Sequence, residues 1–221
     1  MNRLIAIAVF ALVFTGTSAH AEGGYFSANL RVSMVTDTTV SVLGIEVAEI
    51  SFDPGFNIGV ALGQDFGNYR AEFEIAYREA DMDQGAVPGV IAGVVIPGCP
   101  CSGSIDGVFS TLSLMVNGYY DFDSADSPFA PYLGAGIGLA IVDGEIAVLG
   151  PGDSDAVLAF QLMAGIGYEI SPKTKSWAST TLMVGYRYFS AVTDPEIPIF
   201  GVPVEFTLAA HEFNVGVRFG F

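Results

Sequence analysis

Arginine and glutamate residues occupy alternate positions in one short stretch of this sequence. Between residues 69 and 79, the charged side chains of Arg70, Glu72, Glu74 and Arg78 stand at even positions, and mostly apolar residues fill the odd ones. Charged groups on one face of an extended segment can pair with one another or line a path for ions. The chemistry that this pattern offers is charge pairing or ion conduction, and the elements that position these charges must be strands.

Residues that commonly perform catalysis are scarce. His211 is the only histidine after residue 21, whereas a serine-type site needs a histidine within reach of a serine and an acid. His211 also falls on the opposite face of its segment from the neighbouring charges, so we interpret it as an interfacial residue. Gly134, Gly136 and Gly138 mimic a nucleotide-binding loop, but no helix follows them, which indicates packing instead. The sequence therefore predicts no enzyme activity and no cofactor.

Two cysteines, Cys99 and Cys101, flank Pro100. An oxidising compartment would allow them to form a disulfide, although a ring closed over one intervening residue is strained. A zinc site would need further cysteine or histidine ligands, and only His211 is present after residue 21. The sequence leaves a local and an intermolecular disulfide open, and it predicts no metal site.

The chain begins with the pattern of an export signal. Asn2 and Arg3 precede an apolar run from Leu4 to Phe14, and the segment from Ser18 to Ala21 offers an A-x-A cleavage site. This order of features is typical of a secretory signal peptide. A membrane anchor is the alternative, but the apolar run is shorter than the ~20 residues that span a bilayer. We predict that residues 1–21 are a cleaved signal peptide.

Composition narrows the class of the remaining chain. The sequence is 51% hydrophobic with a mean hydropathy of +0.51, yet no segment after residue 21 has the long apolar run of a membrane helix. Apolar residues that alternate with polar ones favour the other structure that can span a bilayer, a closed barrel. Without Arg3, the chain has 7 basic and 24 acidic residues, a net charge of −17. This acidity excludes nucleic-acid binding, which needs a basic surface.

Eight stretches alternate apolar residues with polar or small ones, as strands do when their two faces meet different surroundings. They cover residues 25–34, 56–63, 69–79, 112–121, 133–141, 158–169, 181–188 and 212–221. The segments between them are alternately long and short, and the short ones are 64–68, 123–128 and 171–176. This alternation is typical of outer-membrane barrels. We predict an all-β fold over residues 22–221: an eight-stranded antiparallel transmembrane β-barrel with short periplasmic turns and long extracellular loops.

A soluble sandwich or lipocalin-like barrel is the alternative fold. It would turn the apolar face inward and the polar face to water. The polar face here is rich in glycine and other small residues, which suits a narrow lumen better than a solvated surface. The sequence therefore favours the transmembrane barrel.

Most charges in the predicted strands share the inward face. We predict a lumenal charge network of Arg31, Arg70, Glu72, Glu74, Arg78, Glu169, Arg187, Glu212 and Arg218. Charges in a confined lumen are costly unless they are paired, and eight strands leave room for little beyond side chains. We therefore expect a plug of ion pairs, with Glu212 in contact with Arg187 or Arg31. The alternative is an ion-conducting lumen.

The predicted long loops, residues 35–54, 80–107, 142–156 and 190–205, carry many acidic residues and no lysine or arginine. One interpretation is solubility and mutual repulsion. The other is contact with a basic partner, or with divalent cations that bridge to lipopolysaccharide. Residues 87–97 and 197–204 are also apolar. They either continue strands beyond the membrane or form an exposed patch for a partner.

Four stretches resemble the family of small outer-membrane β-barrel domains, which includes opacity-type proteins, surface antigens and the OmpA transmembrane domain. They are Arg70-Ala-Glu-Phe-Glu-Ile-Ala-Tyr77, Asn117-Gly-Tyr-Tyr-Asp-Phe122, Pro131-Tyr-Leu-Gly-Ala-Gly-Ile-Gly138 and Gly185-Tyr-Arg-Tyr188. The resemblance implies a bacterial outer-membrane location. It also implies an assembly signal in the last strand, with Phe213, Phe219 and Phe221 read by the barrel-assembly machinery.

Fold alone does not determine function in this family. We expect a structural or adhesin-like surface protein that acts through its loops, with a small channel for ions or solutes as the alternative. The expected partners are outer-membrane lipid and lipopolysaccharide, the assembly machinery, and a host or surface ligand at the loops.

Overall fold

The structure is a computed structural model. It describes residues 23–42, 45–85, 90–91, 94–95, 107–122, 127–146, 150–151, 154–171, 179–199 and 202–221. The predicted signal peptide lies outside these residues, and so do Cys99 and Cys101. In the part of the chain that is described, no helix has the length and apolar character needed to cross a membrane.

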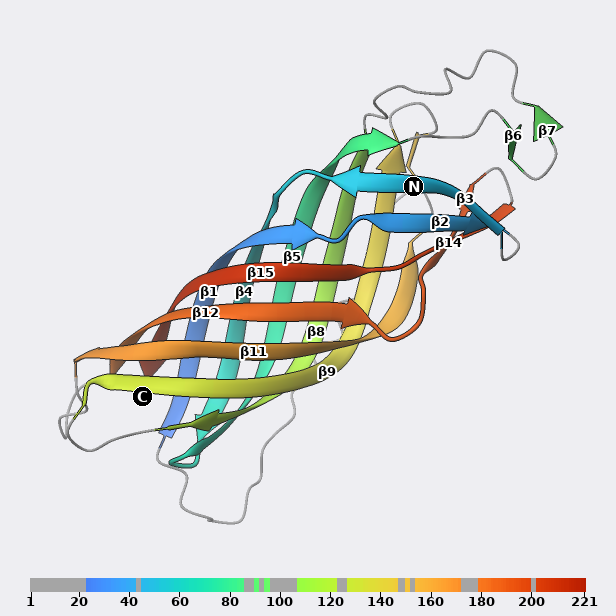
Figure 1. The fold of residues 1–221 in the computed structure, drawn as a ribbon. Helices are drawn as coiled ribbons and strands as arrows, with labels where there is room; N and C mark the ends of the chain where they lie inside the picture. Colours follow the sequence, from blue (N-terminus) through green and yellow to red (C-terminus); the bar gives the residue numbers. More distant parts are fainter. Residues whose placement is uncertain are drawn as a thin grey trace.

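Eight long strands form the wall of a closed barrel (Figure 1). They are β1 (Gly23–Val35), β4 (Gly55–Asp65), β5 (Tyr69–Gly85), β8 (Gly107–Asp121), β9 (Phe129–Ile146), β11 (Asp155–Ser171), β12 (Thr180–Ala191) and β15 (Ala209–Gly220). Each pairs antiparallel with its neighbours, and β1 pairs with β15, so the wall has no free edge. This arrangement confirms the eight predicted strands.

The predicted long loops contain further strands. These are β2 (Thr38–Val42), β3 (Ile45–Phe52), β6 (Val90–Ile91), β7 (Val94–Val95), β10 (Gly150–Pro151), β13 (Glu196–Ile199) and β14 (Val202–Phe206). Strand β3 pairs with the far end of β5, and β2, β14 and β13 follow in that order. We call β3, β2, β14 and β13 the outer sheet. Residues 197–199 and 202–204 of the apolar segment therefore lie in strands, one of the two alternatives that the sequence allowed.

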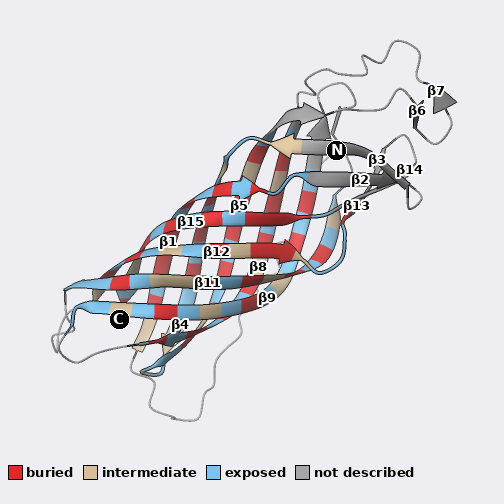
Figure 2. Ribbon diagram, in the orientation of Figure 1, coloured by how far each residue is buried: buried red, intermediate tan, exposed pale blue. Residues whose placement is uncertain are grey.

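Burial alternates along the wall strands, as Figure 2 shows by its red and pale-blue bands. On β1, for example, Asn29 and Arg31 are buried, whereas Leu30 and Val32 are 62% and 51% exposed. Since side chains alternate between the two faces of a strand, one face lines the lumen and the other faces outward. The outward face is the apolar one, which is the reverse of a soluble barrel.

Aromatic side chains mark the two rims of the outward apolar band. At the short-turn end, the rings of Tyr69 and Tyr120 meet edge to face at 5.2 Å. At the other end, the rings of Phe56 and Tyr77 lie 6.4 Å apart. Tyr69 and Tyr77 are eight residues apart on β5, roughly 26 Å along the strand at ~3.3 Å per residue. Aromatic girdles that flank an apolar band of this size are typical of outer-membrane barrels, whose short turns face the periplasm.

Candidate functional site in the barrel lumen

Glu74 lies at the centre of the lumen and is fully buried. Its Oε2 accepts hydrogen bonds from Arg31 Nη2 at 3.0 Å and from Arg187 Nη2 at 2.8 Å, and its Oε1 accepts from Arg187 Nη1 at 2.5 Å. Arg187 Nη1 also donates to Gln161 Oε1 at 2.9 Å. One carboxylate thus joins strands β1, β5 and β12 across the lumen, in two ion pairs that are almost completely shielded from solvent.

Glu212 forms the second centre, and it too is fully buried. Its Oε1 accepts from Arg78 Nε at 2.7 Å and from Asn57 Nδ2 at 2.8 Å. Arg187 Nε lies 3.9 Å from Glu212 Oε2, which confirms the predicted contact between these two residues. The shortest ion pair of Glu212, however, is with Arg78. Sequence reasoning considered only adjacent strands for Glu212, whereas Arg78 on β5 reaches it across the lumen.

A third group lies toward the short-turn end. Arg70 binds Asp121 through two hydrogen bonds, Nε to Oδ2 and Nη2 to Oδ1, the second at 2.8 Å. The Arg70 guanidinium lies 4.5 Å from the ring centroid of Tyr119 and 5.7 Å from those of Tyr25 and Tyr132. Aromatic faces attract a guanidinium, so three rings and one carboxylate hold Arg70.

Asp121 also has a second cationic neighbour. Arg218 Nη1 lies 3.8 Å from Asp121 Oδ2. Asp121 was not in the predicted network, although its position in the alternation of residues 112–121 places it on the inward face. The signal was therefore present in the sequence and was missed.

Glu72 is held by neutral groups instead of arginine. Its Oε1 accepts from the Tyr119 hydroxyl at 2.6 Å and from Asn117 Nδ2 at 3.1 Å, and its Oε2 accepts from the Tyr25 hydroxyl at 3.1 Å. Hydrogen bonds to an ionised carboxylate are stronger than those between neutral groups. Glu72 thus belongs to the part of the network that lies toward the short-turn end.

Eight of the nine predicted network residues line the lumen, and Glu169 does not join them. The alternation of residues along β11 puts Glu169 on the inward face, but Glu169 is exposed near the short-turn end of that strand. Parity alone does not bury a residue at the rim of a barrel, because no layer of side chains covers it from the periplasmic side. The prediction for Glu169 was therefore wrong.

Three glycines make room for the large lumenal side chains. In the register of β8 and β9, Gly134 faces Tyr119, Gly136 faces Asn117 and Gly138 faces Met115. A Cβ atom on Gly134 would collide with the Tyr119 ring, and one on Gly136 with Asn117 Oδ1. The glycine run therefore serves lumenal packing, as the sequence indicated.

The space that remains in this network is small. A cavity of about 20 Å³ lies among these residues, lined by polar side chains such as Glu72 and Arg187 and by apolar ones such as Met163. Ser27 Oγ and Asn214 Oδ1 also line it, and both atoms are buried without a protein partner. Such a cavity holds on the order of one water molecule. At the level of these residues, the lumen is filled by side chains.

His211 lies on the outer surface and is exposed. Its Nδ1 is 2.5 Å from the Tyr186 hydroxyl, and its ring centroid is 5.3 Å from that of Tyr188. Among the described residues, no group of three or more histidine, cysteine, aspartate or glutamate side chains is placed to hold a metal ion. The last strand also carries Phe213, Phe219 and Phe221 outward.

Known proteins share this sequence and architecture. Residues 104–221 match the family described as surface antigen. The outer membrane protein PagN of Salmonella typhimurium is 26% identical over 209 residues, which cover 86% of this chain and 84% of PagN. Neisserial surface protein A has a TM-score of 0.54 at 20% identity, over 91% of this chain and 99% of that one.

Outer membrane protein OprG of Pseudomonas aeruginosa has a TM-score of 0.62 at 13% identity, over 92% of this chain and 98% of OprG. Both solved structures have the same barrel fold. The family match covers more than half of the sequence, and these relatives are outer-membrane proteins of Gram-negative bacteria. The chain therefore belongs to the surface antigen family of outer-membrane β-barrel proteins.

Proposed function

We propose that this protein is a non-enzymatic surface protein that acts through contacts made by its extracellular part, with the barrel as a non-conducting support. The observation that carries the proposal is the filled lumen. Four arginines and four carboxylates are buried there, and the cavity between them is about 20 Å³. Paired charges of this kind lose much of their value if water separates them, so they favour a fixed plug.

A small channel is the alternative that uses the same residues. It would need a continuous wet path past Glu74 and Glu212, both fully buried and bonded to arginines on other strands. Opening that path would break at least one buried ion pair, which costs several kcal/mol, of the order of 3–5, when a partner is lost. The geometry therefore supports a lumen closed by ion pairs over an ion-conducting pore.

The absence of enzyme activity remains part of the proposal. His211 is the only histidine among the described residues, and it faces outward between Tyr186 and Tyr188. A serine-type site would need the histidine to meet a serine and an acid in one cleft. The contacts of His211 suit an aromatic girdle at the membrane surface.

The extracellular part offers the surface for partners. The wall strands β5 and β9 extend beyond the aromatic girdle. The outer sheet joins the far end of β5 through β3. Exposed acids lie in this region, including Asp37, Asp53, Asp81, Asp143 and Asp194. Two partner chemistries suit such a surface: basic groups on a host or surface ligand, and divalent cations that bridge to lipopolysaccharide phosphates. The aromatic last strand suits recognition by the assembly machinery.

Conductance measured in a planar bilayer tests the proposal that the barrel does not conduct ions. The protein without residues 1–21 is refolded, and heat-modifiable gel migration verifies the fold. We expect no steady conductance. Reproducible single-channel steps, altered in a Glu212→Gln variant, would instead establish the pore and place its constriction at the lumenal ion pairs.

Cell-surface binding tests the acidic partner surface. Cells that display the wild-type protein should bind poly-lysine beads, and a variant with Asp37, Asp53, Asp81 and Asp194 changed to Asn should bind fewer. The matched control changes Glu169, which is exposed at the short-turn end, to Gln, so that it removes an acid from the periplasmic side and none from the extracellular surface. Equal binding by wild type and the surface variant would reject these carboxylates as a partner surface.

A further inference from the structure

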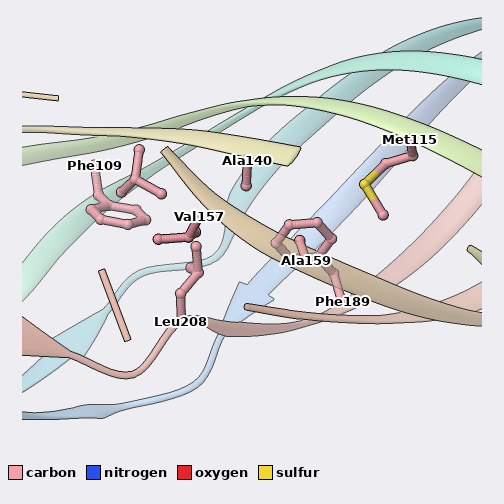
Figure 3. Close-up of a cluster of buried hydrophobic side chains, with 8 residues drawn as sticks. Phe109, Met115, Ala140, Val157, Ala159, Phe189 and Leu208 are labelled. Carbon is pink, nitrogen blue, oxygen red and sulfur yellow. The ribbon is translucent and has the colours of Figure 1, made fainter. Parts of the chain in front are cut away.

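A cluster of buried apolar side chains lies in the lumen, and Figure 3 shows these side chains between the strands of the wall. We call this cluster the lumenal plug; its members are Phe109, Met115, Ala140, Val142, Val157, Ala159, Phe189 and Leu208. All are at most 5% exposed. The ring of Phe189 lies 4.0 Å from the guanidinium of Arg78, so the apolar plug begins where the charged network ends.

Two side chains at the plug come from the ends of the outer sheet. Leu208, 1% exposed, lies in the two-residue connection between β14 and β15. Phe52, the last residue of β3, packs against the cluster with its ring 5.7 Å from that of Phe109. Backbone hydrogen bonds fix both segments: Ala191 N donates to Leu208 O at 2.9 Å, and Asp53 N donates to Asp81 O at 3.0 Å.

The outer sheet links these two segments to each other. Strand β3, which ends at Phe52, pairs with β2, and β2 pairs with β14, which leads to Leu208. A displacement of the sheet would therefore move both side chains together. The rest of the plug comes from the wall strands β8, β9, β11 and β12.

We propose that the lumenal plug and the outer sheet form one closure of the extracellular mouth, and that displacement of the outer sheet opens the lumen as far as the charged network. An apolar layer excludes ions because they would lose their hydration there without gaining hydrogen bonds. The small cavity beside Arg70 and Arg187, by contrast, has polar groups in its lining that can bind a water molecule. This inference rests on the proposed non-conducting barrel, and it adds a second barrier at the extracellular mouth and the element that controls it.

Thiol labelling from outside the cell tests the closure. In a background with Cys99→Ser and Cys101→Ser, one variant carries Ala140→Cys inside the plug and another carries Asp143→Cys, an exposed position on the same strand. Intact cells are treated with a membrane-impermeant methanethiosulfonate. We expect rapid labelling at position 143 and almost none at position 140.

Opening variants provide the second arm. Adding Leu208→Ala and Phe52→Ala should raise the labelling rate at position 140 by about tenfold or more, because local opening then needs less free energy. The matched control adds Leu158→Ala and Leu162→Ala, which remove similar volumes from the outward face. That control should leave position 140 unreactive.

Two outcomes would overturn the closure. One is labelling at position 140 as fast as at position 143 in the intact plug. The other is an unreactive position 140 in a folded variant with both Leu208→Ala and Phe52→Ala. If that variant does not fold, the labelling rate at position 140 is measured in a variant with Leu208→Ala alone. The conductance of the wild type decides the proposed function separately. If the wild type shows no conductance and position 140 is labelled equally slowly in all variants, the non-conducting barrel is retained and the proposed closure is rejected.

Discussion

Two buried arginines form their shortest ion pairs with Glu74. A Glu74→Ala change would leave Arg31 and Arg187 in a lumen from which solvent is almost excluded. We expect the free energy of unfolding to fall by about 3–5 kcal/mol, because Arg31 loses its ion-pair partner and Arg187 keeps only the longer contact with Glu212. Denaturant unfolding in detergent micelles measures the loss.

Glu79 provides the matched control for Glu74 on the same strand. It is outward-facing and only partly buried, and it accepts a hydrogen bond from the Tyr77 hydroxyl at 2.6 Å. A Glu79→Ala change should cost about 1 kcal/mol or less. Equal losses for the two variants would show that the lumenal pairs do not fix the barrel.

Glycine has a specific role at Gly138. A Cβ at this position would collide with the backbone oxygen of Leu114 on β8, which cannot rotate away. We expect Gly138→Ala to destabilise the barrel by about 1–3 kcal/mol through overpacking. Gly118→Ala is the control, because a Cβ there would meet nothing within 4 Å. Refolding yields on heat-modifiable gels compare the two, and similar yields would contradict the packing role.

Alternation and strand adjacency predicted most of the residues that face the lumen and the contact of Arg187 with Glu212, but not the ion pairs that cross the lumen. Alternation placed Arg31, Arg187 and Glu212 on one face, and the register of β12 and β15 sets Arg187 directly opposite Glu212. The pairing of Arg78 with Glu212 depends on how side chains cross the lumen, which no local pattern encodes. Asp121 shows the reverse case, since its parity was readable and only its role was overlooked.

At the scale of elements, the wall strands were predictable and the outer sheet was not. The wall strands have one lipid-facing and one lumenal face, so their residues alternate. Beyond the girdle both faces of a strand leave the lipid, and the alternation that identifies a strand is lost. The segments 38–42 and 45–52 thus form β2 and β3 without a clear pattern.

The free edge of the outer sheet is β13, and Pro198 limits what can pair with it. Pro198 lies opposite Pro203 on β14. Neither has an N–H, so this must be a non-hydrogen-bonded pair, in which the backbone groups point away from the partner strand. Pro198 therefore removes a donor from the outer edge, a common protection against edge-to-edge association.

A Pro198→Thr change should restore that donor and promote self-association. We expect a concentration-dependent dimer in detergent, measured by sedimentation or chemical cross-linking. Ile197→Thr is the control, since position 197 belongs to the alternate, hydrogen-bonded pair and adds no donor at the edge. A Pro198→Thr variant as monomeric as the control would refute the protective role.

At the scale of the whole molecule, the two girdles define where the bilayer lies. Phe73 is 43% exposed and lies midway along β5 between Tyr69 and Tyr77, so it faces the centre of the apolar band. Val108 is 39% exposed on the adjacent β8, where it pairs with Asp81, four residues beyond Tyr77. The two positions have similar exposure but differ in depth.

Arginine substitutions at these positions should therefore differ in cost. Phe73→Arg places a charge near the bilayer centre and should lower the free energy of unfolding in phospholipid vesicles by about 2–4 kcal/mol, whereas Val108→Arg should cost about 0–1 kcal/mol. If the outer face of the barrel were in water instead of lipid, the two substitutions would cost about the same, because both side chains would be solvated. A depth-dependent difference in vesicles thus connects the alternation of single residues, the girdles of the strands and the position of the molecule in the outer membrane.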